Sequence, residues 1–308
     1  MQLDIIGLGE PLIEFNQTGA DGSYMLGHGG DTSNAVIATA RQGARAGYVT
    51  ALGNDQFGDS FIELWSREGV DTTAVQRHSE AHTGVYFVSH GDKGHVFNYL
   101  RGGSAASRLG PQDLHEAYLA SARYLHVSGI SQAISATACD AVFRAIEIVR
   151  AAGGKISYDT NLRLKLWPLA RARAIVDATI PLCDVIFPSL EDATVLTGLS
   201  DRDEILDRYL ALGAPLVVLK LGADGVLVAT ARERRYLAGR KVRTIDATGA
   251  GDTFDGAFLA ATVNGADPFE AARYANAAAA LSTEGFGAVA PIPRRDDVLS
   301  FLAAEDGQ

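Results

Sequence analysis

The segment Thr244-Ile-Asp-Ala-Thr-Gly-Ala-Gly-Asp-Thr-Phe-Asp-Gly-Ala-Phe-Leu-Ala260 joins a glycine-rich turn to the start of a helix. From Ala250 onward, apolar side chains recur at helical spacing, which predicts one buried stripe. We expect Thr248 to cap this helix, because a threonine side chain can accept a hydrogen bond from the first turn. Gly249 and Gly251 lack a Cβ atom, so the backbone there can approach a ligand closely.

A helix that begins in this way leaves backbone N–H groups unpaired at the positive end of its dipole, and such groups bind anions. Asp252 stands beside them, where its charge would repel an anion held only for binding. Its presence is explained if it accepts a proton from a hydroxyl group that attacks a phosphate. An aspartate with an ordinary pKa of about 4 is ionised near pH 7 and can take that proton. The alternative is a capped helix in which Asp252 only complements the dipole.

Length, composition and charge exclude several classes of protein. The 308 residues are 47% hydrophobic, and they contain neither a repeat nor a linker, so we expect a single domain over residues 1–308. The net charge of -10 argues against a nucleic-acid partner. No apolar run is long enough for a membrane span and no secretion signal is evident, so we expect no membrane partner and a cytoplasmic location. The two cysteines form neither a disulfide framework nor a zinc motif.

From residue 114 onward, short apolar segments alternate with helical ones. This alternation predicts a doubly wound, mostly parallel sheet flanked by helices, an α/β fold that binds ligands at the carboxyl ends of its strands. The segments that follow predicted strands are Asp159–Arg163, Ser189–Asp192 and Lys220–Gly225. Candidate ligand-binding side chains are therefore expected there.

Two segments near the N-terminus do not follow that alternation. Residues 82–101 alternate polar and apolar side chains around a turn at Gly91–Gly94, which predicts a hairpin with one apolar face. With the short strands expected earlier in the chain, this hairpin is interpreted as a small β lid formed by about residues 11–30 and 82–104. Side chains that would project from the lid toward a ligand are Tyr86, Tyr99 and Arg101. Cross-strand packing of the tyrosines and a solvated arginine are the alternatives.

The string Asp246–Phe254 resembles the C-terminal signature of the ribokinase-like (PfkB) sugar kinases. The region from Gly29 to Gly58 is similar to their N-terminal signature, and the resemblance extends from Ile5 to about Pro293. It implies a ribokinase-like fold that uses ATP and Mg²⁺. It also implies that the amides of Gly249, Ala250 and Gly251 form an anion hole for the transferred phosphoryl group and that Asp252 is the catalytic base. Asp31 or Thr32 is expected to cap the helix within the N-terminal signature.

Four strings together look like the 2-keto-3-deoxygluconate kinase subgroup: Gly9–Asn16, Gly29–Thr32, Tyr99–Arg108 and Asp159–Trp167. The sugar of that subgroup is an acid, and a carboxylate bound under a lid needs a positive partner, which arginine supplies with a forked pair of hydrogen bonds. By resemblance, the substrate-binding residues are Gly30, Asn34, Tyr86, Tyr99, Arg101, Arg163 and Asp252. For Arg163, an ion pair with Asp159 or another carboxylate is the alternative.

The resemblance also implies a set of nucleotide-binding residues: Asn161, Arg163, Lys220, Gly222, Gly225, Gly249, Gly251 and Asn276. Two positions depart from the wider family. Ser189–Asp192 stands where the family has Asn-x-x-Glu, so Asp192 is the candidate magnesium ligand, with a carboxylate one methylene shorter. Glu14 stands where many kinases of neutral sugars have Asp.

The sequence therefore predicts an enzyme that transfers phosphate from ATP to the 6-hydroxyl of 2-keto-3-deoxygluconate. A kinase of fructose or another neutral sugar is the second hypothesis, and a non-catalytic sugar-sensing protein is the third. The expected partners are the sugar acid, ATP and a second copy of the chain, bound through the lid.

Overall fold

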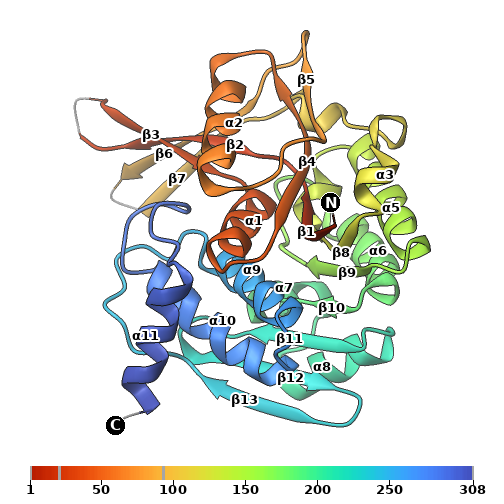
Figure 1. Cartoon of the computed structure of the whole chain (residues 1–308), viewed down its shortest axis with the longest axis vertical. Coiled ribbons are helices and arrows are strands. Elements are labelled where there is room, and N and C mark those ends of the chain that lie inside the picture. Colours follow the sequence, from red (N-terminus) through yellow and green to blue (C-terminus); the bar gives the residue numbers. More distant parts are fainter. Residues whose placement is uncertain (1, 20–21, 92–93, 307–308) are drawn as a thin grey trace.

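The computed structural model describes residues 2–19, 22–91 and 94–306. Within these residues, nine strands form one sheet in the order β13-β12-β11-β10-β9-β8-β1-β4-β5 (Figure 1). The bounds are β1 Leu3–Leu8, β4 Ala46–Gly53, β5 Val75–His78, β8 Ala122–Ser128, β9 Lys155–Asp159, β10 Val185–Ile186, β11 Leu216–Lys220, β12 Gly225–Thr230 and β13 Arg234–Ala238. Neighbours from β11 to β5 are parallel, and β12 and β13 add two antiparallel strands. The predicted doubly wound, mostly parallel sheet is confirmed.

The strand order reverses between β1 and β8. From β1 the chain extends the sheet through β4 and β5 on one side, and from β8 it extends the sheet through β9, β10 and β11 on the other. Every residue of β1 and β4 is buried, as expected for strands covered on both faces. In open α/β sheets, ligands bind outside the carboxyl ends of the strands next to such a reversal.

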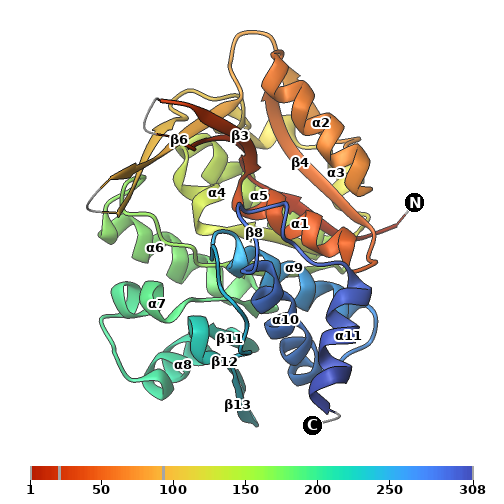
Figure 2. The ribbon, with the colours of Figure 1, turned by 90° about the vertical axis from the view of Figure 1, so that its left-hand side faces the viewer.

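Helices cover both faces of the sheet. Their bounds are α1 Asp31–Arg41, α2 Gln56–Glu68, α3 Glu116–Leu119, α4 Gly129–Ala133, α5 Ala136–Ala151, α6 Leu169–Thr179, α7 Leu190–Thr197, α8 Arg202–Ala211, α9 Ala250–Val263, α10 Pro268–Ser282 and α11 Arg295–Asp306. Figure 2 shows α1, α2, α9, α10 and α11 on one side and α4 to α8 on the other. The stripe predicted for α9 is buried: the rings of Phe258 and Phe187 lie 5.1 Å apart. That packing fixes the first turn of α9 at the edge of the sheet.

A second, four-stranded sheet projects from the N-terminal half (Figures 1 and 2). Its strands are β2 Leu12–Gln17, β3 Tyr24–Gly29, β6 Gly84–Gly91 and β7 Gly94–Leu100, in the order β3-β2-β6-β7. The hairpin of β6 and β7 is antiparallel as predicted, and residues 92–93 of its turn lie outside the described residues. The single apolar face predicted for the hairpin is wrong, because residues 96–100 of β7 are all exposed.

Two local predictions, both of helix caps, differ from the structure. Gly249, in the left-handed conformation with φ 76°, is the N-cap of α9, and the Thr248 hydroxyl instead donates to Asp246 at 2.6 Å. Gly30, with φ 113°, precedes α1, so Asp31 and Thr32 lie inside that helix and do not cap it. A glycine reaches these backbone angles without strain, which explains why it replaces a side-chain cap at both helix starts.

Candidate active site

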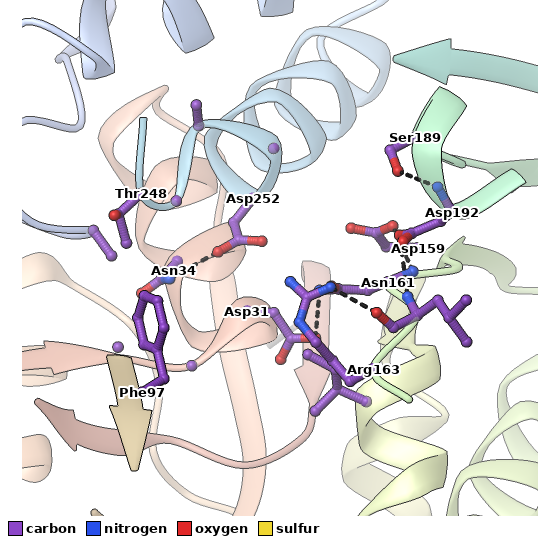
Figure 3. Close-up of a pocket in the computed structure, with 18 of the residues that line it drawn as sticks. Asp31, Asn34, Phe97, Asp159, Asn161, Arg163, Ser189, Asp192, Thr248 and Asp252 are labelled. Carbon is purple, nitrogen blue, oxygen red and sulfur yellow. Dashed lines mark hydrogen bonds between the residues drawn. The ribbon is translucent and has the colours of Figure 1, made fainter. Parts of the chain in front are cut away.

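A cavity of about 1210 Å³ lies between the small sheet, the first turn of α9 and the loops that follow β9 and β10 (Figure 3). The predicted site residues that line it are Gly30, Asn34, Tyr86, Tyr99, Arg101, Asn161, Arg163, Asp192, Lys220, Gly222, Gly249, Ala250, Gly251 and Asp252. A smaller cavity of about 220 Å³ adjoins it and is lined by the two remaining predicted residues, Gly225 and Asn276. The structure therefore gathers all of these side chains and turns at one edge of the main sheet.

The start of α9 presents unpaired backbone amides to the large cavity. The Ala250 amide donates to the Ala247 carbonyl at 3.2 Å, and the Thr253 amide donates to Gly249 at 2.9 Å. Between them, the amides of Gly251 and Asp252 have no acceptor among the described residues. Such amides, at the positive end of the helix dipole, form a site for an anion.

Asp252 lies in this first turn and is held by Asn34, whose amide nitrogen donates to Oδ2 at 2.8 Å (Figure 3). Burial, and next the charge of Asp31, raise the pKa of Asp252 from 3.8 to about 7, although the hydrogen bond from Asn34 opposes them. The ordinary pKa expected from the sequence is therefore wrong. A carboxylate with a pKa near neutrality suits general-base catalysis better, because it binds the accepted proton more strongly.

On the side of the small sheet, the predicted ligand residues are held by buried acids. Arg101 Nε donates to Glu10 Oε2 at 2.7 Å, and the Ser104 hydroxyl donates to the other oxygen of Glu10. The Tyr86 hydroxyl donates to Glu14, and the rings of Tyr86 and Tyr99 are stacked at 5.6 Å. The positive charge of Arg101 is thus already balanced by Glu10, whose side chain is fully buried.

Arg163 lies across the cavity and forms no salt bridge with a described carboxylate, although its charge opposes the rise in the pKa of Asp192 that burial causes. Its Nη1 donates to the carbonyl of Leu162 at 2.8 Å, and it forms no ion pair with any described residue. The alternative of an ion pair with Asp159 is wrong, since Asp159 is paired with Lys220. Arg163 is therefore available to a carboxylate or phosphate in the cavity.

The loop that carries Arg163 is tied to α1 by Asn161. The Asn161 side chain donates to Asp31 Oδ2 at 3.1 Å, and its backbone has φ 27°, the one positive φ of a non-glycine residue in the described chain. Figure 3 shows Asp31 between α1 and this loop. The Asn161 amide group is thus engaged with Asp31, and a nucleotide contact by Asn161 stays a prediction.

Lys220 ends β11 and lies between two buried aspartates. Its Nζ donates to Asp159 Oδ2 and to Asp255 Oδ1, both at 3.1 Å. The two carboxylates raise the pKa of Lys220, which keeps it protonated. Burial raises the pKa of Asp255, while the charge of Lys220 lowers the pKa of Asp159. Asn276, on the smaller cavity, donates its amide to the Ala238 carbonyl at 2.7 Å.

Asp192 lies in the first turn of α7, where its Oδ2 accepts a hydrogen bond from the Leu162 amide at 3.1 Å. Ser189 caps this helix by accepting from the Asp192 amide at 3.1 Å, so serine replaces asparagine here as a helix cap. Burial raises the pKa of Asp192. The described residues contain no group of three acidic, histidine or cysteine side chains that could hold a metal ion. Mg²⁺ commonly binds to one or two carboxylates and to substrate phosphates, and the site suits that mode.

Sequence reasoning missed the buried acids that organise the site. Asp31 was interpreted as a helix cap, and Asp159 was considered only as a possible partner of Arg163 within a candidate ligand-binding segment. No role was expected for Glu10 or Asp255. Of these, Asp255 could have been found, because it follows Asp252 by three residues and so lies on the same face of the helix. The others depend on partners far away in the sequence.

In the described residues, no helix is both long enough and apolar enough to cross a bilayer. The fold and site suit proton removal from a hydroxyl group beside a bound anion. Residues 3–295 match the model of the pfkB family of carbohydrate kinases. The chain therefore belongs to the pfkB carbohydrate kinase family.

Two curated relatives are 2-dehydro-3-deoxygluconokinases, another name for 2-keto-3-deoxygluconate kinases. The one from Bacillus subtilis is 33% identical over 99% of this chain and 97% of its own. The one from Thermoproteus tenax is 34% identical over 96% of this chain and 94% of its own. A fructokinase-2 of Solanum habrochaites is 32% identical over 97% of this chain and 95% of its own.

Solved structures agree with this assignment. A ribokinase II in complex with ATP and Mg²⁺ from E. coli superposes with a TM-score of 0.91 at 28% identity, over 98% of this chain and 99% of that one. A fructokinase with bound ATP from Xylella fastidiosa has a TM-score of 0.91 at 25% identity, over 99% of this chain and 100% of that one. The fold is therefore ribokinase-like, as predicted, and the protein is a sugar kinase.

Proposed function

We propose that this kinase transfers the γ-phosphoryl group of ATP to the 6-hydroxyl of 2-keto-3-deoxygluconate. The observation that carries the proposal is the pairing of two features in one cavity: the buried Asp252 among unpaired amides, and Arg163 without a carboxylate partner. The first feature suits phosphoryl transfer to an alcohol, and the second suits an acceptor that bears a carboxylate. The 2-dehydro-3-deoxygluconokinases among the relatives support the same substrate.

The reaction follows from the geometry of the first turn of α9. Asp252 takes the proton of the 6-hydroxyl as its oxygen forms a bond to the γ-phosphorus. The bond from that phosphorus to the bridging oxygen breaks, and ADP leaves with the electron pair. The amides of Gly249, Ala250 and Gly251 stabilise the negative charge of the transferred group, with those of Gly249 and Gly251 better placed than that of Ala250, which donates to the Ala247 carbonyl. Asn34 holds the carboxylate of Asp252 in place.

The acceptor is assigned to the large cavity. Gly30, Tyr86, Tyr99 and Arg101 form its wall on the side of the small sheet, which we interpret as a lid made by about residues 11–30 and 82–104. Because Glu10 already balances Arg101, the carboxylate of the sugar acid depends chiefly on Arg163. The expectation from the sequence placed both arginines at the sugar acid and Arg163 also at the nucleotide, and this division of roles refines it.

The nucleotide is assigned to the smaller cavity and to the residues that it shares with the larger one, including Lys220 and Gly222. Gly225 and Asn276 line its inner part. When bound, Mg²⁺ would neutralise phosphate charge, and Asp192 is the carboxylate that would contact it or its water shell. Because the reaction consumes ATP, we assign the protein to the cytoplasm.

A coupled assay of ADP release tests the substrate. Wild-type enzyme should turn over 2-keto-3-deoxygluconate far faster than fructose or ribose, and Arg163→Ala should raise the KM for the sugar acid by roughly tenfold to a hundredfold, as expected for loss of a charged hydrogen bond. Preferential turnover of fructose would instead establish the second hypothesis, a neutral-sugar kinase. Absence of ADP release with every sugar would support the sugar-sensing alternative.

A homo-oligomer formed through the small sheet is also assigned. Exposed apolar side chains gather on it: Tyr24, Met25, Leu26, Val96, Phe97, Tyr99 and Leu100. Both edge strands of this sheet, β3 and β7, carry such residues, so a second copy could cover them. Light scattering after size-exclusion chromatography should give a dimer or larger species that Leu26→Glu dissociates. A monomeric wild-type protein would contradict the assignment.

A further inference from the structure

Lys220 lies at the boundary between the two cavities. The residues that line both are Lys220, Gly222, Ala247, Ala250 and Gly251. A phosphoryl group that passes from the nucleotide to the sugar must cross this boundary. Apart from Lys220, the boundary consists of glycine and alanine residues, so Lys220 supplies its one charged side chain among the described residues.

The ammonium group of Lys220 is next to the start of α9. A Cβ atom built on Gly251 would lie 3.5 Å from Nζ, so the lysine and the Gly251 amide border the same small space. The side chain of Lys220 is only 13% exposed, and its Nζ also lies 5.9 Å from the centre of the Phe187 ring. The charge is therefore held in a defined position beside the anion hole.

Two carboxylates hold the lysine there from opposite elements. Asp159 comes from the end of β9 and Asp255 from α9, one turn after Asp252. Both lie 3.1 Å from Nζ, and their side chains are 8% and 0% exposed. A buried lysine with two buried carboxyl groups adds little stability, because well-packed apolar residues of similar volume stabilise a core equally well or better. The arrangement is explained if the lysine must remain charged and correctly aimed for an anion.

We propose that Lys220 is a catalytic residue that stabilises the transferring phosphoryl group, and that Asp159 and Asp255 are positioning residues that aim its ammonium group at the anion hole. This inference rests on the proposed function of the same site. It goes beyond it by assigning Lys220 to the transition state, and by giving Asp159 and Asp255 the role of positioning the lysine.

The consequence is a separation between binding and turnover. A cation that contacts the transferring phosphoryl group stabilises the transition state more than it stabilises the bound nucleotide. The reason is that negative charge on the transferred oxygens is redistributed during the reaction. Lys220→Met should therefore lower kcat by roughly a hundredfold to a thousandfold. The affinity for ADP, measured by calorimetry, should change by less than about threefold, since ADP lacks the transferred group.

Lys155→Met is the matched control. Lys155 begins β9, the strand that ends at Asp159, so it lies at the opposite end of the sheet from the site. Its loss should leave kcat unchanged.

A double-mutant cycle tests the positioning role. Asp255→Asn alone should lower kcat at least about tenfold, because it removes one of the carboxyl oxygens to which the lysine donates. In the Lys220→Met background the same change should cost less than about twofold, because the residue that Asp255 acts through is gone. The double variant replaces both members of the Lys220–Asp255 pair, which costs less stability than removing one member alone, so the test remains available if Lys220→Met alone is unstable.

The outcomes are distinguishable from failure of the proposed function, because the cycle requires only that the wild-type enzyme phosphorylates an acceptor. A kcat for Lys220→Met within threefold of wild type would overturn the catalytic role. Independent, multiplying losses in the double variant would overturn the positioning role of Asp255. A loss of ADP affinity as large as the loss of kcat would show that Lys220 only binds nucleotide.

Discussion

The pKa of Asp252 predicts how the enzyme responds to pH. Burial and the charge of Asp31 raise this pKa to about 7, so the base is half protonated near neutrality in the free enzyme. The pH profile of kcat/KM reports groups of the free enzyme. It should therefore show an acidic limb with a midpoint near pH 7. Two pH units below that midpoint, on the order of 1% of the molecules carry the ionised base, so kcat/KM should have fallen by about a hundredfold.

Two substitutions should move this limb in opposite directions. Asp31→Asn removes the charge that raises the pKa of Asp252 most, which favours the ionised form of Asp252 and shifts the limb to lower pH. Asn34→Ala removes a hydrogen bond that lowers the pKa of Asp252, so the limb should move to higher pH. General damage to the site would lower the plateau without producing opposite shifts.

The assay is initial-rate kinetics of ADP release between pH 5 and pH 9 with subsaturating sugar acid, each variant scaled to its own plateau. Asp140→Asn, an exposed position on α5, is the control for a lost carboxylate. A wild-type limb near pH 4, or shifts of the same sign in both variants, would refute this account of how the base is tuned.

Three further predictions concern stability and the anion hole. Asp252→Asn should raise the free energy of unfolding by up to about 4 kcal/mol at pH 8 and by little at pH 4. The reason is that ionising the buried acid destabilises the folded state only as the pH rises from 3.8 to about 7. Urea titrations at both pH values check this, and an equal gain in the free energy of unfolding at both would contradict it. Glu10→Gln should lower the free energy of unfolding by about 3 kcal/mol, because it leaves Arg101 buried without a counter-charge. Asp59→Asn, in the exposed pair with Arg77, should cost less than about 1 kcal/mol, and equal losses would be inconsistent with the burial argument. Gly249→Ala should lower kcat at least about tenfold, because Gly249 has φ 76° and the new Cβ atom would lie 3.0 Å from Ala288. Full activity of this variant would mean that the turn does not shape the anion hole.

The main sheet was predictable because parallel strands buried on both faces produce short apolar runs, and such runs alternate with helical segments from residue 114 onward. Strands β12 and β13 were not predicted, since they interrupt that alternation with an antiparallel hairpin. The caps of α1 and α9 were predicted wrongly for one reason. The sequence offers a side chain that can cap in both places, while the chain uses the backbone freedom of the preceding glycine.

The membership of the candidate site could be predicted, but its electrostatics could not. Loops after strands in a doubly wound fold converge on one edge, so residues such as Arg163 and Lys220 were expected near Asp252. Charge partners are a different matter: Glu10 and Arg101 are separated by 91 residues, and Asp31 and Asn161 by 130. Such pairs decide that Arg163 rather than Arg101 is free for an anion, and that Asp252 has a pKa near neutrality. They become visible only once the chain is folded.

The most direct test of the central claim is the single-turnover rate of Asp252→Asn with 2-keto-3-deoxygluconate and ATP, measured beside the binding of both ligands. If Asp252 is the base, the sugar acid and ATP should bind with affinities close to those of the wild-type enzyme, while formation of the 6-phosphate slows by at least about a hundredfold. Formation of the 6-phosphate at the wild-type rate would contradict the claim.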